Sequence, residues 1–333
     1  MCSSDLNLTD RIMLSASGAL DMDEFCVGSI GVVSQSGGIL GALLSRAAAR
    51  GIGLSKLVST GNEADLDIAD FVDHLADDPD TRTLALYIES IRDPVTFRAA
   101  AEKAARAGKP VVAYKVGRSE AGMRAASSHT GALAGSDRMY DAFFESCGVV
   151  RAATFSNLLD IASALSSSRR LRGKRVATLT STGGAGTLIC DALGVAGFES
   201  PNPDAETAQK LRGLVSGDVA TMDSNPIDVT LAGLQPEILR KAIGVLFESP
   251  SYDALCIIVG SSGIAQPELM ADALQACLPL SDKPVIAYLS PHAPAAGAVL
   301  TARGVPAFTE PEACAAAILP CCSTCFVSSA CFI

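Results

Sequence analysis

The sequence predicts an α/β protein built from two tandem, doubly wound parallel sheets. Apolar, strand-like runs alternate with helical patterns along the chain, and such alternation is typical of parallel strands covered by helices on both faces. The pattern also occurs twice. In each half an apolar, β-branched run leads into a Ser/Gly turn and then into an Ala/Leu-rich helical stretch, at SIGVVSQSGG (29–38) and RVATLTSTGG (175–184).

Further strands follow the first βα unit of each half in the same order. The apolar run at 83–89 corresponds to that at 253–260, and KPVVAY at 109–114 corresponds to KPVIAY at 283–288. Apolar spacing predicts helices at 39–50, 68–75, 94–107, 157–165, 185–194, 236–247 and 266–278. The shared order of elements indicates a duplicated fold.

A polar, basic and Gly-containing segment, SSSRRLRGK at 166–174, separates the two halves. We therefore predict a first domain at 28–166 and a second at 167–319. Residues 1–27 and the Cys-rich tail at 320–333 do not continue the pattern, and we expect both ends to be linker, remnant or foreign sequence.

Bulk properties exclude several classes of function. A formal net charge of −10 leaves no broad basic face for nucleic acid. The apolar runs are too short to cross a bilayer and residues 1–20 do not resemble a signal peptide, so we expect no membrane span and a cytoplasmic location. Cysteines in apolar segments, such as Cys190, Cys256 and Cys277, indicate buried free thiols. Cys322 and Cys325 have CxxC spacing without a second pair, and we expect no metal site.

The two Ser/Gly turns are candidate phosphate sites. A strand that ends in such a turn and opens a helix leaves backbone N–H groups unpaired at the positive end of the helix dipole. Glycine lets a phosphate approach the backbone, and Ser34 could add a hydroxyl donor. The candidates are Ser36, Gly37 and Gly38 in the first half and Gly183, Gly184, Ala185 and Gly186 in the second. The alternative is that these glycines only let a helix pack closely on its sheet.

His129 lies in ASSHTGALAGSD, a run of small residues that we expect to be a loop before a helix opening near Ser136 or Asp137. Its imidazole has a nucleophilic nitrogen at neutral pH and could accept and pass on a phosphoryl group. An ordinary surface histidine is the alternative. His74 and His292 lack this setting and are interpreted as structural or solvent-exposed.

Glu89 lies at the carboxyl end of a predicted strand, where open α/β sheets place functional groups. A carboxylate that accepts from one imidazole nitrogen leaves the other free to attack, so Glu89 could orient His129. Pairing with Arg92, three residues on, is the alternative. A further motif, NPID, contains Asn225, Pro226 and Asp228, and reads either as a turn with an Asx cap or as a support for the phosphate loop.

Together, SQSGG, IESIRDP, SSHTGALAGSD, STGGAG and NPID resemble the acyl-CoA synthetase (NDP-forming) family, which includes ADP-forming acetate–CoA ligase and is related to succinyl-CoA synthetase. The resemblance spans about 28–318. It implies two flavodoxin-like domains, a phosphohistidine at His129, an orienting glutamate at Glu89, and paired phosphate-binding helices at the two turns.

The reaction implied by this resemblance converts acid, CoA and ATP to acyl-CoA, ADP and phosphate through an acyl phosphate and a phosphohistidine. CoA and ATP or ADP are then substrates, and none of them is expected to bind tightly to this chain alone. The family's CoA-binding domain, of which 1–27 would be a remnant, and its ATP-grasp module, which would hold Mg²⁺, are not recognised in the chain. Expected partners are therefore an ATP-grasp domain or subunit, a CoA-binding domain and a small carboxylic acid or acyl-CoA, in a homo- or hetero-oligomer.

Two other functions remain open. Similar domains occur as acyl-CoA or nucleotide sensors fused to protein acetyltransferases, where the histidine is often replaced; retention of His129 argues against that assignment. A flavodoxin-like electron carrier would bind FMN at the first βα turn. With no Trp and 5 Tyr, the chain offers few aromatic side chains to stack on a flavin.

Overall fold

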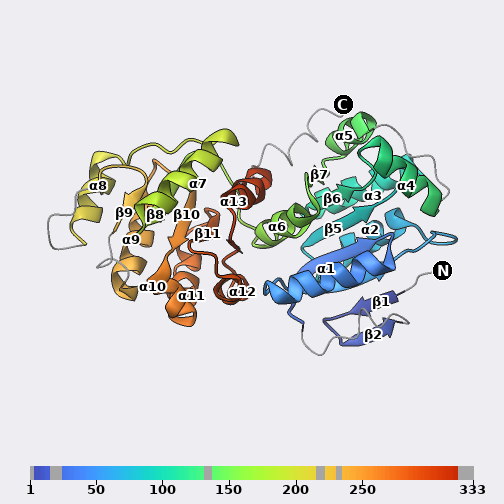
Figure 1. Ribbon diagram of the computed structural model, residues 1–333, viewed down its shortest axis with the longest axis horizontal. Helices are drawn as coiled ribbons and strands as arrows, with labels where there is room; N and C mark the ends of the chain where they lie inside the picture. The colour runs from blue at the N-terminus through green and yellow to red at the C-terminus, as the bar shows by residue number, and fades with distance from the viewer. Residues whose placement is uncertain (1–3, 16–24, 131–136, 215–221, 230–234, 322–333) are drawn as a thin grey trace. The chain divides into compact units, whose positions relative to one another are not determined.

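The computed structural model describes residues 4–15, 25–130, 137–214, 222–229 and 235–321, which form two compact units (Figure 1). The first unit lies within Met1–Ser166 and the second within Ser167–Ser323. Each unit contains a sheet with helices on both faces, so the predicted α/β class with two sheets is confirmed.

The sheet of the first unit has seven strands in the order β2-β1-β4-β3-β5-β6-β7. The strands β4-β3-β5-β6-β7 run parallel to one another. Numbered along the chain within this set, their order is 2-1-3-4-5, which is the flavodoxin-like order. The bounds are β3 (Val27–Ser34), β4 (Leu54–Ser59), β5 (Thr83–Ile88), β6 (Val111–Lys115) and β7 (Val150–Arg151).

Helices cover both faces of this sheet. Buried side chains of α2 (Ile68–Asp77), α3 (Pro94–Arg106) and α5 (Asp137–Ser146) share one core with alternate strand residues such as Leu84 and Leu86. On the other face α1 (Gly37–Ala49) contacts β3 and β4, and α6 (Phe155–Ser166) contacts β3, β5 and β6. The helix α4 (Glu120–Thr130) precedes α5.

The second unit repeats this arrangement with a five-stranded parallel sheet in the order β12-β11-β10-β8-β9. Its strands are β8 (Val176–Thr180), β9 (Ile227–Asp228), β10 (Ala254–Val259), β11 (Val285–Leu289) and β12 (Ala307–Phe308). One core is shared by α8 (Ala205–Arg212), α9 (Pro236–Glu248), α11 (Pro267–Gln275) and α12 (Pro294–Ala302), whereas α7 (Gly183–Val195) and α13 (Pro311–Ile318) pack together against β8 and β11. A short helix, α10 (Ser261–Ala265), follows β10.

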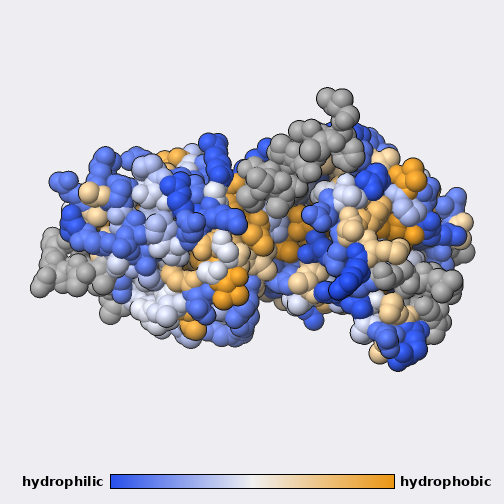
Figure 2. All heavy atoms as spheres, turned by 90° about the horizontal axis from the view of Figure 1, so that it is seen from above, coloured by the Kyte–Doolittle hydropathy of each residue, from blue (hydrophilic) through white to orange (hydrophobic). Residues whose placement is uncertain are grey.

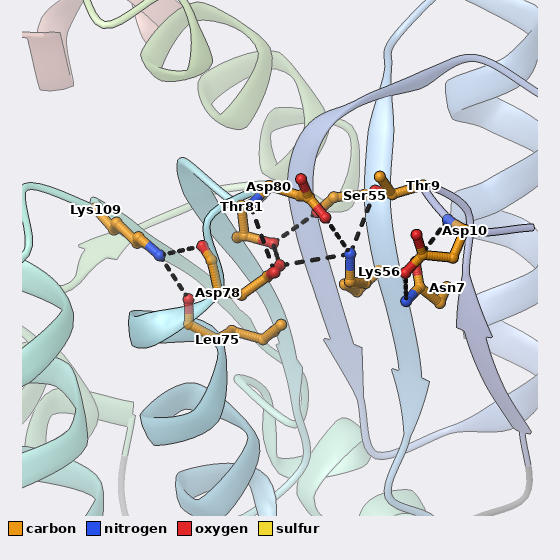
Figure 3. Close-up of polar contacts among 10 residues, drawn as sticks. All are labelled: Asn7, Thr9, Asp10, Ser55, Lys56, Leu75, Asp78, Asp80, Thr81 and Lys109. Carbon is orange, nitrogen blue, oxygen red and sulfur yellow. Dashed lines mark hydrogen bonds and ion pairs between the residues drawn. The ribbon is translucent and has the colours of Figure 1, made fainter. Parts of the chain in front are cut away.

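The duplication extends to single side chains at the amino edge of the sheets. Lys109 donates from Nζ to the carbonyl oxygens of Leu75 (3.0 Å) and Asp78 (2.5 Å) at the end of α2 (Figure 3). Lys283 makes the equivalent contacts with Leu246 (3.4 Å) and Ser249 (2.7 Å) at the end of α9. Each lysine therefore donates to carbonyls at the carboxyl end of a helix.

The N-terminal residues, expected to be a linker or a remnant of a preceding domain, add strands to the first sheet. β1 (Ser4–Asn7) and β2 (Ile12–Ser15) form an antiparallel pair, and β1 lies at the edge of the sheet along β4. Lys56 on β4 contacts Thr9 (3.3 Å) and Asp80 (2.9 Å), which ties this hairpin to the loop before β5 (Figure 3). The sheet is thus parallel only from β4 onward.

Other boundaries also shift. The helices expected from 39 and 185 begin at Gly37 and Gly183, because glycines of the turn already adopt helical geometry. Pro320 and Cys321 are buried in the second unit, where the Cys321 carbonyl accepts from the Leu171 amide (2.7 Å). Cys322, Cys325 and the rest of the tail lie outside the described residues.

On the face shown in Figure 2 hydrophilic residues predominate over the second unit, whereas hydrophilic and apolar residues are mixed over the first. Within the described part of the chain, no helix combines the length and the apolar character needed to cross a membrane. Cys256 and Cys277 are buried free thiols as predicted, and Cys190 is half-buried.

Candidate functional site at the carboxyl edge of the first sheet

The carboxyl ends of β3 and β5 form the point at which the strand order reverses in the first unit. In open α/β sheets ligands bind outside the carboxyl ends of the strands at such a switch point. The turn after β3 leads into α1, and Glu89 directly follows β5. Two of the predicted site elements therefore meet at this edge.

A hydroxyl group shapes the turn between β3 and α1. Ser34 Oγ donates to the Ser36 carbonyl (2.8 Å) and accepts from the Ser36 amide (3.1 Å). Ser36 is the N-cap residue of α1, and its side chain makes no capping hydrogen bond. The first hydrogen bond within the helix runs from the Leu40 amide to the Ser36 carbonyl oxygen (3.0 Å). The amides of the first turn before Leu40 therefore point out of the helix toward the carboxyl edge of the sheet.

The second unit builds its turn in the same way. Thr180 Oγ1 donates to the Thr182 carbonyl (3.0 Å) and accepts from the Thr182 amide (2.8 Å). Thr182 is the N-cap of α7 and also makes no side-chain capping bond. Helices such as α2, α3 and α8 instead begin with an aspartate that caps their amides. The two Gly-rich helix starts thus share the same turn geometry, and neither has a side-chain cap on its first amides.

The glycines of these turns divide into two kinds. A Cβ atom added at Gly38, Gly183 or Gly184 would meet nothing within 4 Å, so close helix packing does not explain these residues. At Gly186 a Cβ would lie 3.0 Å from the ring of Pro226, and the Gly186 amide donates to Thr182 (3.1 Å). Gly186 is therefore needed for packing, whereas the others leave the helix start open.

Glu89 is buried, with 9% of its surface exposed, and its backbone is held by Gln35. Gln35 Oε1 accepts from the amides of Glu89 (2.5 Å) and Ser90 (3.0 Å), and Gln35 Nε2 donates to the Ser90 carbonyl (2.8 Å). The Gln35 amide in turn donates to the Tyr87 carbonyl (3.2 Å). One side chain of the first turn thereby fixes the chain on both sides of the Glu89 α-carbon.

The charge of Glu89 acts on groups around it. Burial and then the charge of Glu89 raise the pKa of Tyr87 to about 12. Arg92, the alternative partner of Glu89, donates from its guanidinium to the carbonyl oxygen of Glu63. Glu63 is itself a buried carboxylate in the loop after β4, and burial raises its pKa although Gln35, Thr60 and Ile68 hydrogen-bond to it.

His129 does not lie in a loop, because α4 extends to Thr130. The alanines of 121–126 favour helix strongly enough to carry it through the Ser/Thr residues that we expected to break it. The His129 side chain lies outside the described residues, as do residues 131–136. His74 and His292 are exposed, as predicted.

Ion pairs flank the segment that carries His129. The helix α5 begins at Asp137, as expected, and Arg151 on β7 binds the carboxylates of both Asp137 and Asp141. Arg118, which precedes α4, approaches Asp137 (Nε to Oδ2, 3.5 Å) and donates to the Ala153 carbonyl (2.6 Å). Arg118, before α4, and Arg151, after it, therefore share the carboxylate of Asp137.

Asn225 of the NPID motif is not an Asx cap. Its Oδ1 accepts from the Thr178 amide (3.0 Å) and its Nδ2 donates to the Val176 carbonyl (2.8 Å), so it occupies the edge of β8 like a strand residue. Pro226 then packs on Gly186, and Asp228 pairs with Thr180 in the parallel ladder. The motif supports the start of α7 by packing.

The comparison of the two units reveals residues that the sequence analysis missed. Where the first unit has Gln35, Glu89 and Lys115, the second has Ser181, Gly260 and Leu289 at the equivalent strand ends. Gln35 could have been found as a longer amide side chain in SQSGG at the position where STGGAG has Ser181. Lys115 could have been found as a charge that ends an apolar strand.

Known proteins resemble this chain both in sequence and in fold. Residues 27–165 match the family model described as "Succinyl-CoA ligase like flavodoxin domain". The alpha subunit of acetate–CoA ligase (ADP-forming) II from Pyrococcus furiosus is 35% identical over 299 residues, which cover 87% of this chain and 64% of the relative. The chain is similar to the ADP-forming acyl-CoA synthetases. The resemblance inferred from its motifs is thereby confirmed.

Two further relatives agree with this assignment. Acetate–CoA ligase (ADP-forming) I from Archaeoglobus fulgidus is 33% identical over 85% of this chain and 40% of its own length. A solved structure of an acetyl-coenzyme A synthetase from Ca. Korarchaeum cryptofilum, in complex with phosphate and ADP, matches 97% of this chain and 69% of its own, with a TM-score of 0.83 and 27% identity. The chain thus spans less than two thirds of the curated relatives, 64% and 40% of their lengths.

Proposed function

We propose that this chain is the phosphoryl-carrying part of an ADP-forming acyl-CoA synthetase. The observation that carries the proposal is the polar edge of the first sheet. There a buried carboxylate, Glu89, follows β5 beside a helix start with open amides, in the unit that contains His129 and matches the family domain. The second unit, which lacks Glu89, would contribute only the start of α7.

The reaction would be reversible, and in the direction that consumes acyl-CoA it would proceed in three transfers. A phosphate oxygen attacks the thioester carbon, the C–S bond breaks, and CoA leaves as the thiol after taking up a proton. A nitrogen of His129 then attacks the phosphorus of the acyl phosphate, and the carboxylate of the acid leaves. Finally, a β-phosphate oxygen of ADP attacks the phosphorus, the P–N bond breaks, and ATP and free histidine result.

The residues of this chain would do two things in these steps. Glu89 would hold one imidazole nitrogen of His129 so that the other carries the attacking lone pair. The amides at the start of α1, from Ser36, Gly37 and Gly38, would stabilise the negative charge of the phosphoryl group. Those at the start of α7, from Gly183, Gly184 and Ala185, would offer a phosphate site within the second unit. Gly186 would keep its packing role against Pro226.

The nucleotide and its Mg²⁺ are assigned to an ATP-grasp partner, and CoA to a CoA-binding domain, on a separate chain or on the same one. The printed name of the Pyrococcus furiosus relative, a subunit alpha, supports a partner subunit. Within the described part of the chain no cluster of three or more His, Cys, Asp or Glu side chains could hold a metal ion. We place the protein in the cytoplasm, where these substrates are found.

The test is phosphorylation of the purified chain by radiolabelled ATP in the presence of a separately expressed ATP-grasp subunit. We expect an acid-labile, base-stable label on the chain that is lost in His129→Ala. His74→Ala is the matched control, because His74 is an exposed histidine of α2 and should leave the label unchanged. A wild-type chain that stays unlabelled with a partner shown to be active would refute the proposal and favour a non-catalytic acyl-CoA or nucleotide sensor.

A further inference from the structure

Lys115 is an unusual residue for its position. It ends β6 at the carboxyl edge, its side chain is buried with 1% of its surface exposed, and burial lowers its pKa. Its Nζ donates to the Val116 carbonyl and lies 4.5 Å from the centroid of the Tyr140 ring. An ammonium group loses much hydration energy when it is buried, so a lysine at such a place requires an explanation.

The duplication shows that the fold does not need a charge here. Leu289 occupies the same position at the end of β11, after the matching residues of KPVVAYK and KPVIAYL, and is also buried with 1% exposed. A leucine therefore satisfies the packing of this strand end. The lysine is found only in the unit that carries Glu89 and His129.

The contacts of Lys115 lead to both parts of the proposed site. Tyr140 lies in α5, close behind the segment that follows His129, and its hydroxyl hydrogen-bonds to the backbone of Ile91, two residues beyond Glu89. Lys115 pairs with Ile88 in the ladder, and the Val116 amide donates to the Ile88 carbonyl (3.0 Å). The charges of Glu89, Asp137 and Arg151 all act on Lys115.

We propose that Lys115 and Tyr140 form a positioning pair that ties the start of α5 to the loop after β5, so that Glu89 and the segment carrying His129 are held together for phosphoryl transfer. The ammonium on the ring face fixes α5 to the end of β6, and the hydroxyl of the same ring fixes it to Ile91. The role of this pair in phosphoryl transfer rests on the proposed function. Whether the pair holds α5 to the loop after β5 can be measured without phosphorylation.

The first experiment uses substitutions that separate charge from packing. Lys115→Leu copies the second unit, and we expect it to melt at or above the wild-type temperature while the labelling of His129 slows about tenfold or more. Lys115→Arg keeps a cation on the ring and should label within about threefold of wild type. Tyr140→Leu removes both contacts of the ring and should label at least as slowly as Lys115→Leu, and the double variant should be no slower than Tyr140→Leu, because the contact of the ammonium needs the ring.

A second measurement does not depend on phosphorylation. Hydrogen exchange should become about tenfold faster in α5 and in the loop at 89–93 in Lys115→Leu, but not in α11 of the second unit. Lys109→Leu is the matched control, since it removes a lysine at the other end of the same strand and should leave labelling unchanged. Normal labelling of Lys115→Leu, additive losses in the double variant, or unchanged exchange in α5 would overturn the inference. An unlabelled wild type would instead overturn the proposed function alone, and the exchange result would still decide the role of the pair.

Discussion

Replacing Gln35 by methionine tests whether the first turn positions Glu89. Methionine keeps the length and approximate volume of the side chain, so no cavity forms, but all three hydrogen bonds to the backbone of Glu89 and Ser90 are lost. The Glu89 amide is buried and the Ser90 groups are part-buried. At roughly 1 to 3 kcal/mol for a buried group left without a partner, and less for the part-buried ones, we expect a loss of about 2 to 4 kcal/mol.

That loss leaves the first unit folded, because domains are stable by about 5 to 15 kcal/mol. Urea unfolding should show it directly, and His129 labelling should slow about 10- to 100-fold, because Glu89 is no longer held in place. Ser181→Ala, at the equivalent position of the second turn, should change the free energy of unfolding by less than about 0.5 kcal/mol. If Gln35→Met unfolds at the wild-type urea concentration, or labels at the wild-type rate, the assigned role of Gln35 is wrong.

Three further predictions concern single residues. Gly38→Ala adds a Cβ where nothing lies within 4 Å, so stability should stay equal or rise by up to about 1 kcal/mol while labelling slows; unimpaired labelling would show that no phosphate approaches this helix start. Hydrogen bonds from Thr207 and Ser251 hold the pKa of Asp204 below its usual range, so its stabilisation is present above about pH 4 and is lost as pH falls through the folded-state pKa. Between pH 4 and pH 2 the free energy of unfolding of Asp204→Asn should therefore fall less than that of the wild type. An equal fall in the two proteins would contradict this. Lys283→Met should destabilise the second unit by about 1 to 3 kcal/mol, because the carbonyls of Leu246 and Ser249 lose their donor; calorimetry that shows no change would refute the capping role.

The duplicated α/β fold could be predicted because its signal is local. Each strand of the buried parallel sheets is a short apolar run, and each covering helix repeats its apolar residues with helical spacing, so neighbouring residues already record the element type. The first βα turn was found for the same reason. Strand, turn and helix start are adjacent in the chain, and the geometry of Ser34, Ser36 and Gly38 follows from that short segment.

Local patterns failed where two tendencies competed. The small residues around His129 suggested a loop, but the alanines before it extend α4 to Thr130. At the N-terminus, the segments of β1 and β2 are only four residues each and become strands because the edge of β4 offers them backbone partners. Neither outcome is visible in composition alone.

The sequence by itself determined the two doubly wound sheets, the resemblance to the ADP-forming acyl-CoA synthetases, and the identity of His129 and Glu89 as candidates. Only the tertiary structure decided that Gln35 holds the backbone around Glu89, a residue 54 positions away, and that the ammonium of Lys115 lies on the ring of Tyr140. The physical reason is that hydrogen bonds and cation–π contacts act over a few ångströms in space. Which distant residues come within that range is set by the strand order of the sheet, and no pattern along the chain records it.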